Sequence, residues 1–271
     1  MSSIKKKKIG CIGVGNMGGA IVLGLEAKIP AGNLNIFDTD KNKLAPFSKK
    51  DIITSASIEA LVKNSDIIII AVKPDTVNFI LDEIKNLIDN KIILSIAAGI
   101  SNYQIEKRIG HTNKIIRVMP NTPSLAGEGM IVMSPNGNVN EESLTIAKDI
   151  FSSIGKVMIL PEKLMNAVTG LSGSGPAYVF TFIQALADGG VKMGIPRDKS
   201  IILAAQTVLG SAKLVLENTE DPITLRNMVT SPGGTTIDAV HILDRSGFAG
   251  YVIDAVETAT KKSKKLGEDG V

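Results

Sequence analysis

The chain has 271 residues, of which 44% are hydrophobic and 21% are charged. This balance is typical of a globular protein and excludes a largely disordered one, and the length allows two domains with a sizeable core. Its single cysteine, Cys11, excludes a disulfide framework and a cysteine-based metal cluster; we interpret it as a core residue of the first predicted strand, the alternative being a reactive thiol.

The net charge is +3, and much of the basic excess lies in two runs, Lys5–Lys8 and residues 261–265. Such runs can bind nucleic acid or membrane surfaces. The chain has no tryptophan, so a base-stacking surface is not indicated, and we interpret both runs as solvated ends. Without a run of 18 apolar residues or a signal peptide pattern, we expect no membrane or nucleic-acid partner and a cytoplasmic protein.

The first part of the chain alternates strand-like and helix-like segments, which predicts a parallel α/β sheet. Residues 66–72 are a continuous β-branched run, which indicates a strand buried on both faces, as in a doubly wound sheet. Residues 75–88 carry apolar side chains at helical spacing. We therefore predict one α/β domain over residues 1–161, with strands at 8–13, 33–38, 66–72, 91–97, 114–119 and 155–160.

Beyond Pro161 the pattern becomes helical, which predicts an all-α domain over residues 162–271. The segment 198–217 is apolar on nearly all of its faces, and such a helix must be buried on all sides. A domain this small has a thin core, so we expect burial against a second copy of the chain. A self-contained bundle is the alternative. The predicted helices are 164–170, 176–193, 198–217, 222–229, 235–245 and 249–266.

A glycine motif, Gly13-Val14-Gly15-Asn16-Met17-Gly18, lies between the first predicted strand and a helix. In this context the motif predicts a dinucleotide site. Gly13 permits the tight turn, Gly15 lets the backbone approach a pyrophosphate, and Gly18 lets the helix pack closely on the strand. The helix N-terminus offers N–H groups to the phosphates.

Further cofactor contacts are expected where other strands end. Asp38 closes the second strand, where a carboxylate suits the free 2′-hydroxyl of NAD; this favours NADH, although Lys41 and Lys43 follow, and Asp38 could also cap the next helix. The small residues at the end of the predicted strand 91–97 leave room for a nicotinamide ribose. Asn121 lies in a stiff Pro-Asn-Thr-Pro loop that could hold the nicotinamide carboxamide. The two strand-end loops are Ala71-Val72-Lys73-Pro74 and Ile96-Ala97-Ala98.

Two glycine-serine loops precede predicted helices in the second half, at Leu171–Pro176 and Ser231–Thr236. Hydroxyls and unpaired N–H groups at a helix start can bind a carboxylate, although each loop could be a plain capped start. His111 and His241 are expected to be structural, and no metal site stands out. The small number of acid–base residues indicates an electrophile that is already activated, such as a protonated C=N bond, because hydride addition to it needs no strong acid from the protein.

These segments together resemble the pyrroline-5-carboxylate reductase family along nearly the whole chain. The resemblance implies a Rossmann domain followed by an all-α dimerisation domain, and dimers that can assemble into larger rings. It also implies NAD(P)H-dependent reduction of 1-pyrroline-5-carboxylate to L-proline. The segments that carry it are Gly13–Gly18, Ala71–Pro74, Arg117–Pro123, Leu171–Tyr178 and Ser231–Ile237.

The resemblance also implies roles for individual residues. Thr236 would hydrogen-bond the ring nitrogen as the catalytic residue, and Asn121 would lie at the nicotinamide. Two positions depart from the common pattern: Gln184 stands where an acidic residue is usual, and Asp38 is unusual for members that favour NADPH. The implied substrate contacts are Glu162, Val229, Ser231, Gly234, Thr235 and Thr236. The implied cofactor contacts are Ile12, Gly13, Val14, Gly15, Asn16, Met17, Ala71, Val72, Lys73, Pro74, Ile96, Ala97 and Ala98.

Two other functions are alternatives to the reductase. A 3-hydroxyacid dehydrogenase starts with a similar glycine motif but needs a catalytic lysine followed four residues later by asparagine. Here Lys213 has Asn218 five positions on. A protein that binds NAD(P) without turnover would have lost the substrate loop, yet Thr235 and Thr236 are both present. We therefore favour the reductase.

Overall fold

A computed structural model describes residues 3–269, and within this range the chain forms two compact units. The first unit runs to Ser174 and takes up the chain again from Thr258, and the second is Gly175–Glu257. The predicted boundary at 161/162 differs from this division. Met165 and Val168 pack on Val132 of the sheet, so the first helical residues after Pro161 belong to the first unit.

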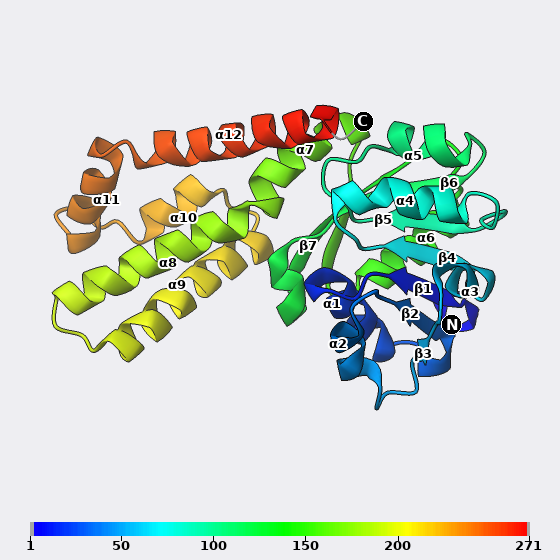
Figure 1. The fold of residues 1–271 in the computed structure, drawn as a ribbon. Coiled ribbons are helices and arrows are strands. Elements are labelled where there is room, and N and C mark those ends of the chain that lie inside the picture. The colour runs from blue at the N-terminus through cyan, green and yellow to red at the C-terminus, as the bar shows by residue number, and fades with distance from the viewer. Residues whose placement is uncertain (1–2, 270–271) are drawn as a thin grey trace. The chain divides into compact units, whose positions relative to one another are not determined.

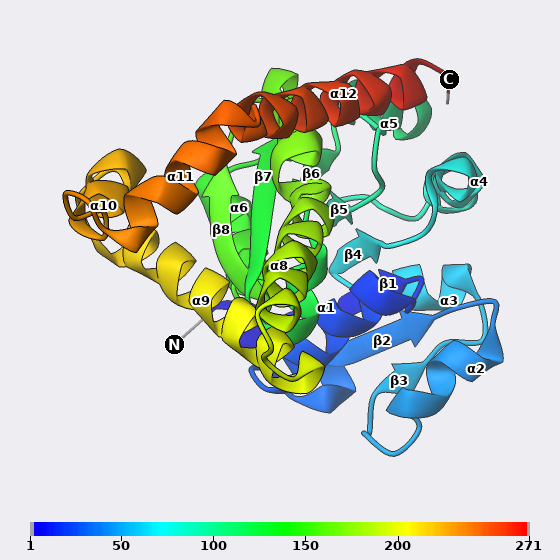
Figure 2. The same ribbon diagram turned by 90° about the vertical axis from the view of Figure 1, so that its left-hand side faces the viewer.

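The first unit is built on one eight-stranded sheet with the strand order β3-β2-β1-β4-β5-β6-β7-β8 (Figures 1 and 2). Strands β1 to β6 are parallel, β7 runs antiparallel to β6, and β8 is parallel to β7. The chain goes outward from β1 in both directions, which is the doubly wound topology expected from the sequence. The strands are β1 Ile9–Ile12, β2 Leu34–Phe37, β3 Ile53–Thr54, β4 Ile67–Ile70, β5 Ile92–Ser95, β6 Lys114–Met119, β7 Gly129–Pro135 and β8 Gly155–Ile159.

Helices cover both faces of this sheet. Helices α1 and α6 pack on one face around Phe151, and helices α3, α4 and α5 pack on the other around Ile84. Because both faces are covered, β1 and β4 are buried along their whole length, as their continuous apolar sequence predicts. The helices are α1 Asn16–Glu26, α2 Lys41–Leu44, α3 Ile58–Lys63, α4 Pro74–Ile84, α5 Asn102–Ile109, α6 Glu141–Phe151 and α7 Met165–Val168.

Cys11 lies in this core, on β1. Burial, with a smaller contribution from the charge of Asp38, raises the pKa of its thiol to about 12. A thiol with so high a pKa carries no thiolate at neutral pH, and the thiolate is the reactive form. The structure therefore agrees with the interpretation of Cys11 as a core residue.

Two strands were missing from the sequence-based description. Strand β3 has only two residues at the edge of the sheet, too few to show a periodic pattern. Strand β7 has a clear signal in the run Met130-Ile131-Val132-Met133, which was overlooked because the expected order alternated strands with helices. As an antiparallel strand next to β6, β7 needs no crossover helix.

The second unit is helical, as predicted. Helices α8 Gly175–Lys192 and α9 Arg197–Glu217 pack on each other and run in opposite directions (Figure 1), and the chain turns between them at Gly194, whose φ is +94°. Gly190 faces Ser200 at the contact between the two helices, where a side chain on Gly190 would collide with the hydroxyl. The remaining helices are α10 Pro222–Met228, α11 Thr235–Arg245 and α12 Phe248–Asp269, the last of which ends in the first unit.

Helix α9 leaves much of its apolar surface uncovered within one chain. Ile202, Leu203 and Leu209 are all exposed, and the buried residues of α9 are only Ser200 and Ala204. By length and composition alone α9 could also cross a membrane, with a mean hydropathy of 1.4. The exposed apolar surface of α9 therefore indicates that this helix packs against a partner.

Candidate functional site

The glycine turn between β1 and α1 has the geometry that each of its glycines was expected to provide. Gly13 has a φ of +91°, and its N–H donates to the Phe37 carbonyl at 2.8 Å. A Cβ on Gly18 would lie 2.0 Å from the Gly13 carbonyl oxygen, so only glycine lets α1 approach the turn this closely. A Cβ on Gly15 would meet no atom within 4 Å, so the backbone there faces open space. The turn thus leaves room for a group at the start of α1.

Asp38 holds this turn from the neighbouring strand. Its carboxylate accepts the Val14 N–H at 3.0 Å and the Asp40 N–H at 2.9 Å, and it lies 3.7 Å from the Lys43 ammonium group. Its side chain is only 8% exposed. The alternative in which Asp38 caps the next helix does not hold, because Asp40 is the residue whose side chain accepts the Asn42 N–H at the start of α2.

The expected cofactor loops all follow parallel strands that end at the same edge of the sheet. Ile12 is in register with Phe37 on one side and with Ile70 on the other, and Ile70 is in register with Ser95. The Ala71 N–H donates to the Ile12 carbonyl at 2.8 Å, and the Ile96 N–H donates to the Ile70 carbonyl at 3.1 Å. The fold therefore brings together the glycine turn, Asp38, Ala71–Pro74 and Ile96–Ala98.

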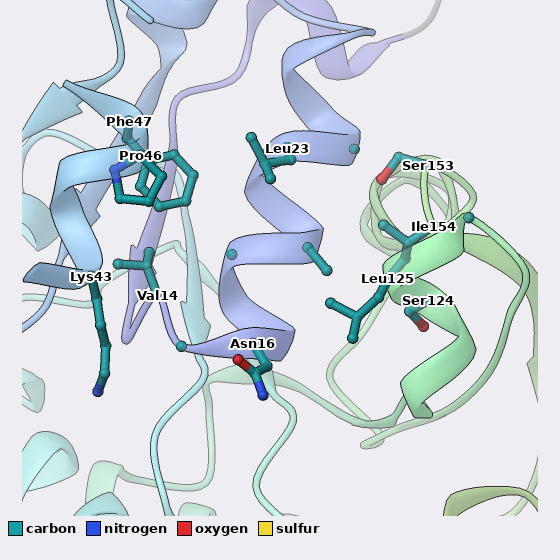
Figure 3. Close-up of a pocket in the computed structure, with 15 residues that line it drawn as sticks. Val14, Asn16, Leu23, Lys43, Pro46, Phe47, Ser124, Leu125, Ser153 and Ile154 are labelled. Atoms are coloured by element: carbon teal, nitrogen blue, oxygen red, sulfur yellow. The ribbon is translucent and has the colours of Figure 1, made fainter. Parts of the chain in front are cut away.

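A pocket of about 560 Å³ opens beside the start of α1 (Figure 3). Val14 and Asn16 line it together with Lys43, Pro46 and Phe47 on one side of α1, and with Ser124, Leu125, Ser153 and Ile154 on the other. Its volume is in the range of small-molecule sites, roughly 300–1,000 Å³. Sequence reasoning found Val14, Gly15, Asn16 and Lys43 but missed the apolar lining, which comes from three separate segments with no shared motif.

Asn121 has a structural role that the sequence did not suggest. Its side-chain N–H donates to the Ser172 carbonyl at 3.0 Å, and its side-chain oxygen accepts the Met130 N–H at 2.9 Å. The carboxamide therefore ties the end of β6 to β7 and to the segment before α8. Contact between Asn121 and the nicotinamide stays a prediction, and half of the hydrogen-bonding capacity of the side chain is already used.

Glu162 is likewise engaged within the first unit. Its carboxylate accepts the Asn102 N–H at 2.6 Å, at the start of α5, and lies 3.5 Å from the buried Arg117 guanidinium. Burial lowers the pKa of Arg117, and the charge and hydrogen bond of Glu162 oppose that shift. Glu162 thus compensates a buried charge, and its contact with substrate stays a prediction.

The first glycine-serine loop does not start a helix in the way expected. Residues Thr169–Gly173 form a π-helical turn that follows α7 directly, and the Ser174 N–H donates to the Thr169 carbonyl at 2.8 Å. The hydroxyl of Ser172 donates to the Val168 carbonyl at 3.1 Å. The expected loop is therefore helical, and the Ser174 N–H and the Ser172 hydroxyl are already bonded, while anion binding at this segment stays a prediction.

The second loop, in the second unit, does form an open helix start. Ser231-Pro232-Gly233-Gly234 is a turn in which the Gly234 N–H donates to the Ser231 carbonyl at 3.0 Å and Gly233 has a φ of +67°. This is the sequence that a type II turn requires, with proline second and glycine third. Gly234 then caps α11 without a side-chain hydrogen bond, which leaves the first N–H groups of the helix to an outside acceptor.

All of the predicted substrate residues except Glu162 lie at or next to this turn. Ser231 and Thr235 are exposed and Thr236 is half-buried, and Val229 is exposed immediately before the turn. Among the described residues, the hydroxyl of Thr236 has no hydrogen bond within the chain. Across residues 3–269 there is no group of three His, Cys, Asp or Glu side chains placed for a metal ion.

Comparison with known proteins decides the family. Over 265 residues the chain is 43% identical to a pyrroline-5-carboxylate reductase of Escherichia coli K12, covering 96% of this chain and 98% of that one. The chain belongs to the pyrroline-5-carboxylate reductase family. The model of the pyrroline-5-carboxylate reductase dimerisation domain matches residues 162–266, and that of the NADP oxidoreductase, coenzyme F420-dependent, matches residues 8–99.

Solved structures of family members have the same fold. The pyrroline carboxylate reductase of Plasmodium falciparum with NADP bound is 37% identical, with a TM-score of 0.88 over 97% of this chain and 99% of that one. The reductase of Coxiella burnetii is 32% identical, with a TM-score of 0.91 over 96% and 98%. The oxidoreductase model covers the glycine turn, Asp38 and the loops Ala71–Pro74 and Ile96–Ala98 of this reductase-family chain. The dimerisation model covers Glu162 and the Ser231 turn.

Proposed function

We propose that the chain reduces 1-pyrroline-5-carboxylate to L-proline by hydride transfer from NAD(P)H, the last step of proline biosynthesis. The observation that carries this proposal is the match to pyrroline-5-carboxylate reductases along the whole chain, with both the cofactor edge and the Ser231 turn present. When bound, the dinucleotide supplies the hydride. The chain supplies position, a dry surrounding and a hydrogen bond to nitrogen.

The cofactor edge fits a dinucleotide. The open space at Gly15 admits a pyrophosphate to the N–H groups at the start of α1, and Ala71–Pro74 and Ile96–Ala98 lie on the neighbouring strand ends. Asp38 is prepared to accept a ribose hydroxyl, because two backbone N–H groups fix its carboxylate. A carboxylate there repels a 2′-phosphate, so the chain prefers NADH over NADPH.

The Ser231 turn suits the substrate carboxylate. The open N–H groups of Thr235 and Thr236 stand at the positive end of the α11 dipole, where an anion is stabilised. The free hydroxyl of Thr236 hydrogen-bonds the ring nitrogen. Val229 lines the ring pocket, Ser231 and Gly234 complete the carboxylate contact, and Glu162 lies near the substrate.

The reductase works as a homodimer, which can assemble into a larger ring. The exposed apolar side chains of α9 support this arrangement, because a second copy would bury them. The same burial accounts for the hydropathy of α9 without a membrane. The protein is cytoplasmic, with a small-molecule substrate and no nucleic-acid partner.

Initial rates with 1-pyrroline-5-carboxylate and each of NADH and NADPH test the proposal. We expect the absorbance of the reduced nicotinamide to fall with both, and a higher kcat/KM with NADH. A 3-hydroxyacid assayed with NAD in the opposite direction is the control for the rival dehydrogenase. Oxidation of the hydroxyacid without turnover of the imine would overturn the proposal, and so would binding of NADH without turnover of either.

A further inference from the structure

Two glycine backbones far apart in the sequence touch each other in the first unit. Gly99 follows the loop Ile96–Ala98, and Gly267 lies near the end of α12. A Cβ on Gly267 would lie 2.7 Å from the Gly99 carbonyl oxygen. A Cβ on Gly99 would lie 3.4 Å from the Gly267 nitrogen, and the φ of Gly99 is +81°. The contact in this form therefore requires glycine on both sides.

A glutamine side chain fastens the same contact. The Gln104 side-chain N–H donates to the Gly267 carbonyl at 3.0 Å, while its side-chain oxygen accepts the Ser101 N–H at 2.7 Å. One amide thus links the start of α5 to the last turn of α12, and both views show these two helix ends near each other (Figures 1 and 2). One turn earlier, the buried Ser263 hydroxyl donates to the Asn166 side chain at 3.0 Å. The end of α12 is therefore fixed at two levels.

The loop next to this contact is held at both of its ends. The Ile96 N–H is bonded to Ile70 in the sheet, Ala97 is buried, and Gly99 rests against Gly267. Only Ala98 of this loop is exposed. Because two fixed points lie three residues apart, a shift of the Gly99 carbonyl is transmitted to the backbone of Ala97 and Ala98.

We propose that the last turn of α12 is a positioning element for the nicotinamide half of the cofactor. It acts through the contact of Gly267 with Gly99, which sets the backbone of Ile96–Ala98. The inference rests on the proposed function, in which this loop touches the nicotinamide ribose. It explains why a glycine, a poor helix former, lies inside α12 at this point.

The test compares two alanine substitutions in the same helix. Gly267→Ala pushes the Gly99 carbonyl away, whereas Gly250→Ala adds the same methyl group where nothing lies within 4 Å. NADH binding is measured by the fluorescence of the bound nicotinamide, which is convenient because the chain has no tryptophan. ADP-ribose binding, measured by calorimetry, reports on the glycine turn alone, because this fragment lacks the nicotinamide half.

For Gly267→Ala we expect the Kd of NADH to rise about tenfold, the effect of losing one good contact, with the Kd of ADP-ribose unchanged. Gly267→Val should weaken NADH further, and Gln104→Ala should act in the same direction. Gly250→Ala should bind both ligands like the wild type. An unchanged Kd of NADH for Gly267→Ala would overturn the inference, and so would an equal loss of NADH and ADP-ribose. None of these measurements uses the imine, so failure of the proposed reaction would be seen separately.

Discussion

At the scale of single residues, the chemistry of the proposed reaction depends on few groups. The strongest candidate is Thr236, whose hydroxyl is free among the described residues and stands at the start of a helix with open N–H groups. In the proposed mechanism, removing it takes away one or two hydrogen bonds to the reacting ring. Thr236 is the residue that we propose to hydrogen-bond the ring nitrogen.

For Thr236→Ala we expect kcat/KM for 1-pyrroline-5-carboxylate to fall about 10- to 100-fold, because one or two hydrogen bonds to the reacting ring are lost. Thr236→Ser keeps the hydroxyl and should recover most of the rate. Steady-state kinetics of both variants, with thermal unfolding as a check on the fold, gives the answer. Equal rates for Thr236→Ala and the wild type would remove Thr236 from the mechanism.

We propose that Asp38 sets the preference between the two nicotinamide cofactors. For Asp38→Ser we expect the ratio of kcat/KM for NADPH to that for NADH to rise, because the charge that repels the 2′-phosphate is gone. Binding of both cofactors should weaken, since the Val14 N–H loses its acceptor. Asp40→Ser is the control, because that carboxylate accepts the Asn42 N–H and leaves Val14 untouched. A ratio that moves equally in both variants would contradict the role of Asp38.

The sequence predicts which residues stand at the strand ends better than it predicts their hydrogen-bond partners. The position of Asp38 beside the glycine turn could be predicted, because an acidic residue at this spacing from the glycine motif ends the second strand of a dinucleotide fold. The bonds of Asn121 to Ser172 and Met130 could not be found, because they join segments whose approach is set only by the folded sheet. The same holds for Glu162, whose partners Asn102 and Arg117 lie far away in the sequence.

At the scale of elements, two glycines of the turn between β1 and α1 have different roles, one in packing and the other in the proposed cofactor binding. Gly18 is needed for the approach of α1 to the turn, whereas Gly15 faces open space with a φ of −66° that any residue can adopt. Two identical substitutions should therefore have different consequences.

For Gly18→Ala we expect a loss of roughly 1–3 kcal/mol in the free energy of unfolding, because the methyl group overlaps the Gly13 carbonyl. Gly15→Ala should unfold like the wild type but bind NADH more weakly, because its methyl group occupies the space of the pyrophosphate. Urea denaturation and NADH titration of both variants check this pair. A Gly15→Ala variant that binds NADH normally would show that the cofactor lies elsewhere.

The elements themselves were predicted from two kinds of local pattern. Continuous apolar runs located β1 and β4, and glycine with proline located the turn between α8 and α9. The π-helical turn at Thr169–Gly173 was mistaken for a loop, because its serine and glycine residues favour loops in isolation. In the folded chain the Asn121 side chain donates to the Ser172 carbonyl within this turn, a contact between segments far apart in the sequence.

At the scale of the whole molecule, the apolar surface of α9 requires a partner. Leu209 is 58% exposed in one chain, and its neighbours on the helix are exposed as well. The composition of this helix predicted a second copy correctly in outline, since the chain carries the family's dimerisation domain. The division between the two units was harder to place, because α12 runs from one unit into the other.

For Leu209→Glu we expect the homodimer to dissociate at micromolar concentration, because the interface would bury an unpaired carboxylate. Lys199→Glu, a charge change at an exposed polar position of the same helix, should leave the dimer intact. Analytical ultracentrifugation of both variants measures the mass. A Leu209→Glu variant that keeps the mass of the wild type would place this face outside the interface.

In the proposed reaction the chain transfers a hydride from NADH to the C=N bond of 1-pyrroline-5-carboxylate. The most direct measurement uses NADH deuterated at the transferred C4 position and identifies the product by mass spectrometry and NMR. We expect L-proline with one deuterium at its δ carbon, formed in step with NADH oxidation, and formed about 10- to 100-fold more slowly by Thr236→Ala at low imine concentration. Proline without deuterium, or oxidation of NADH without proline, would contradict the proposed reaction.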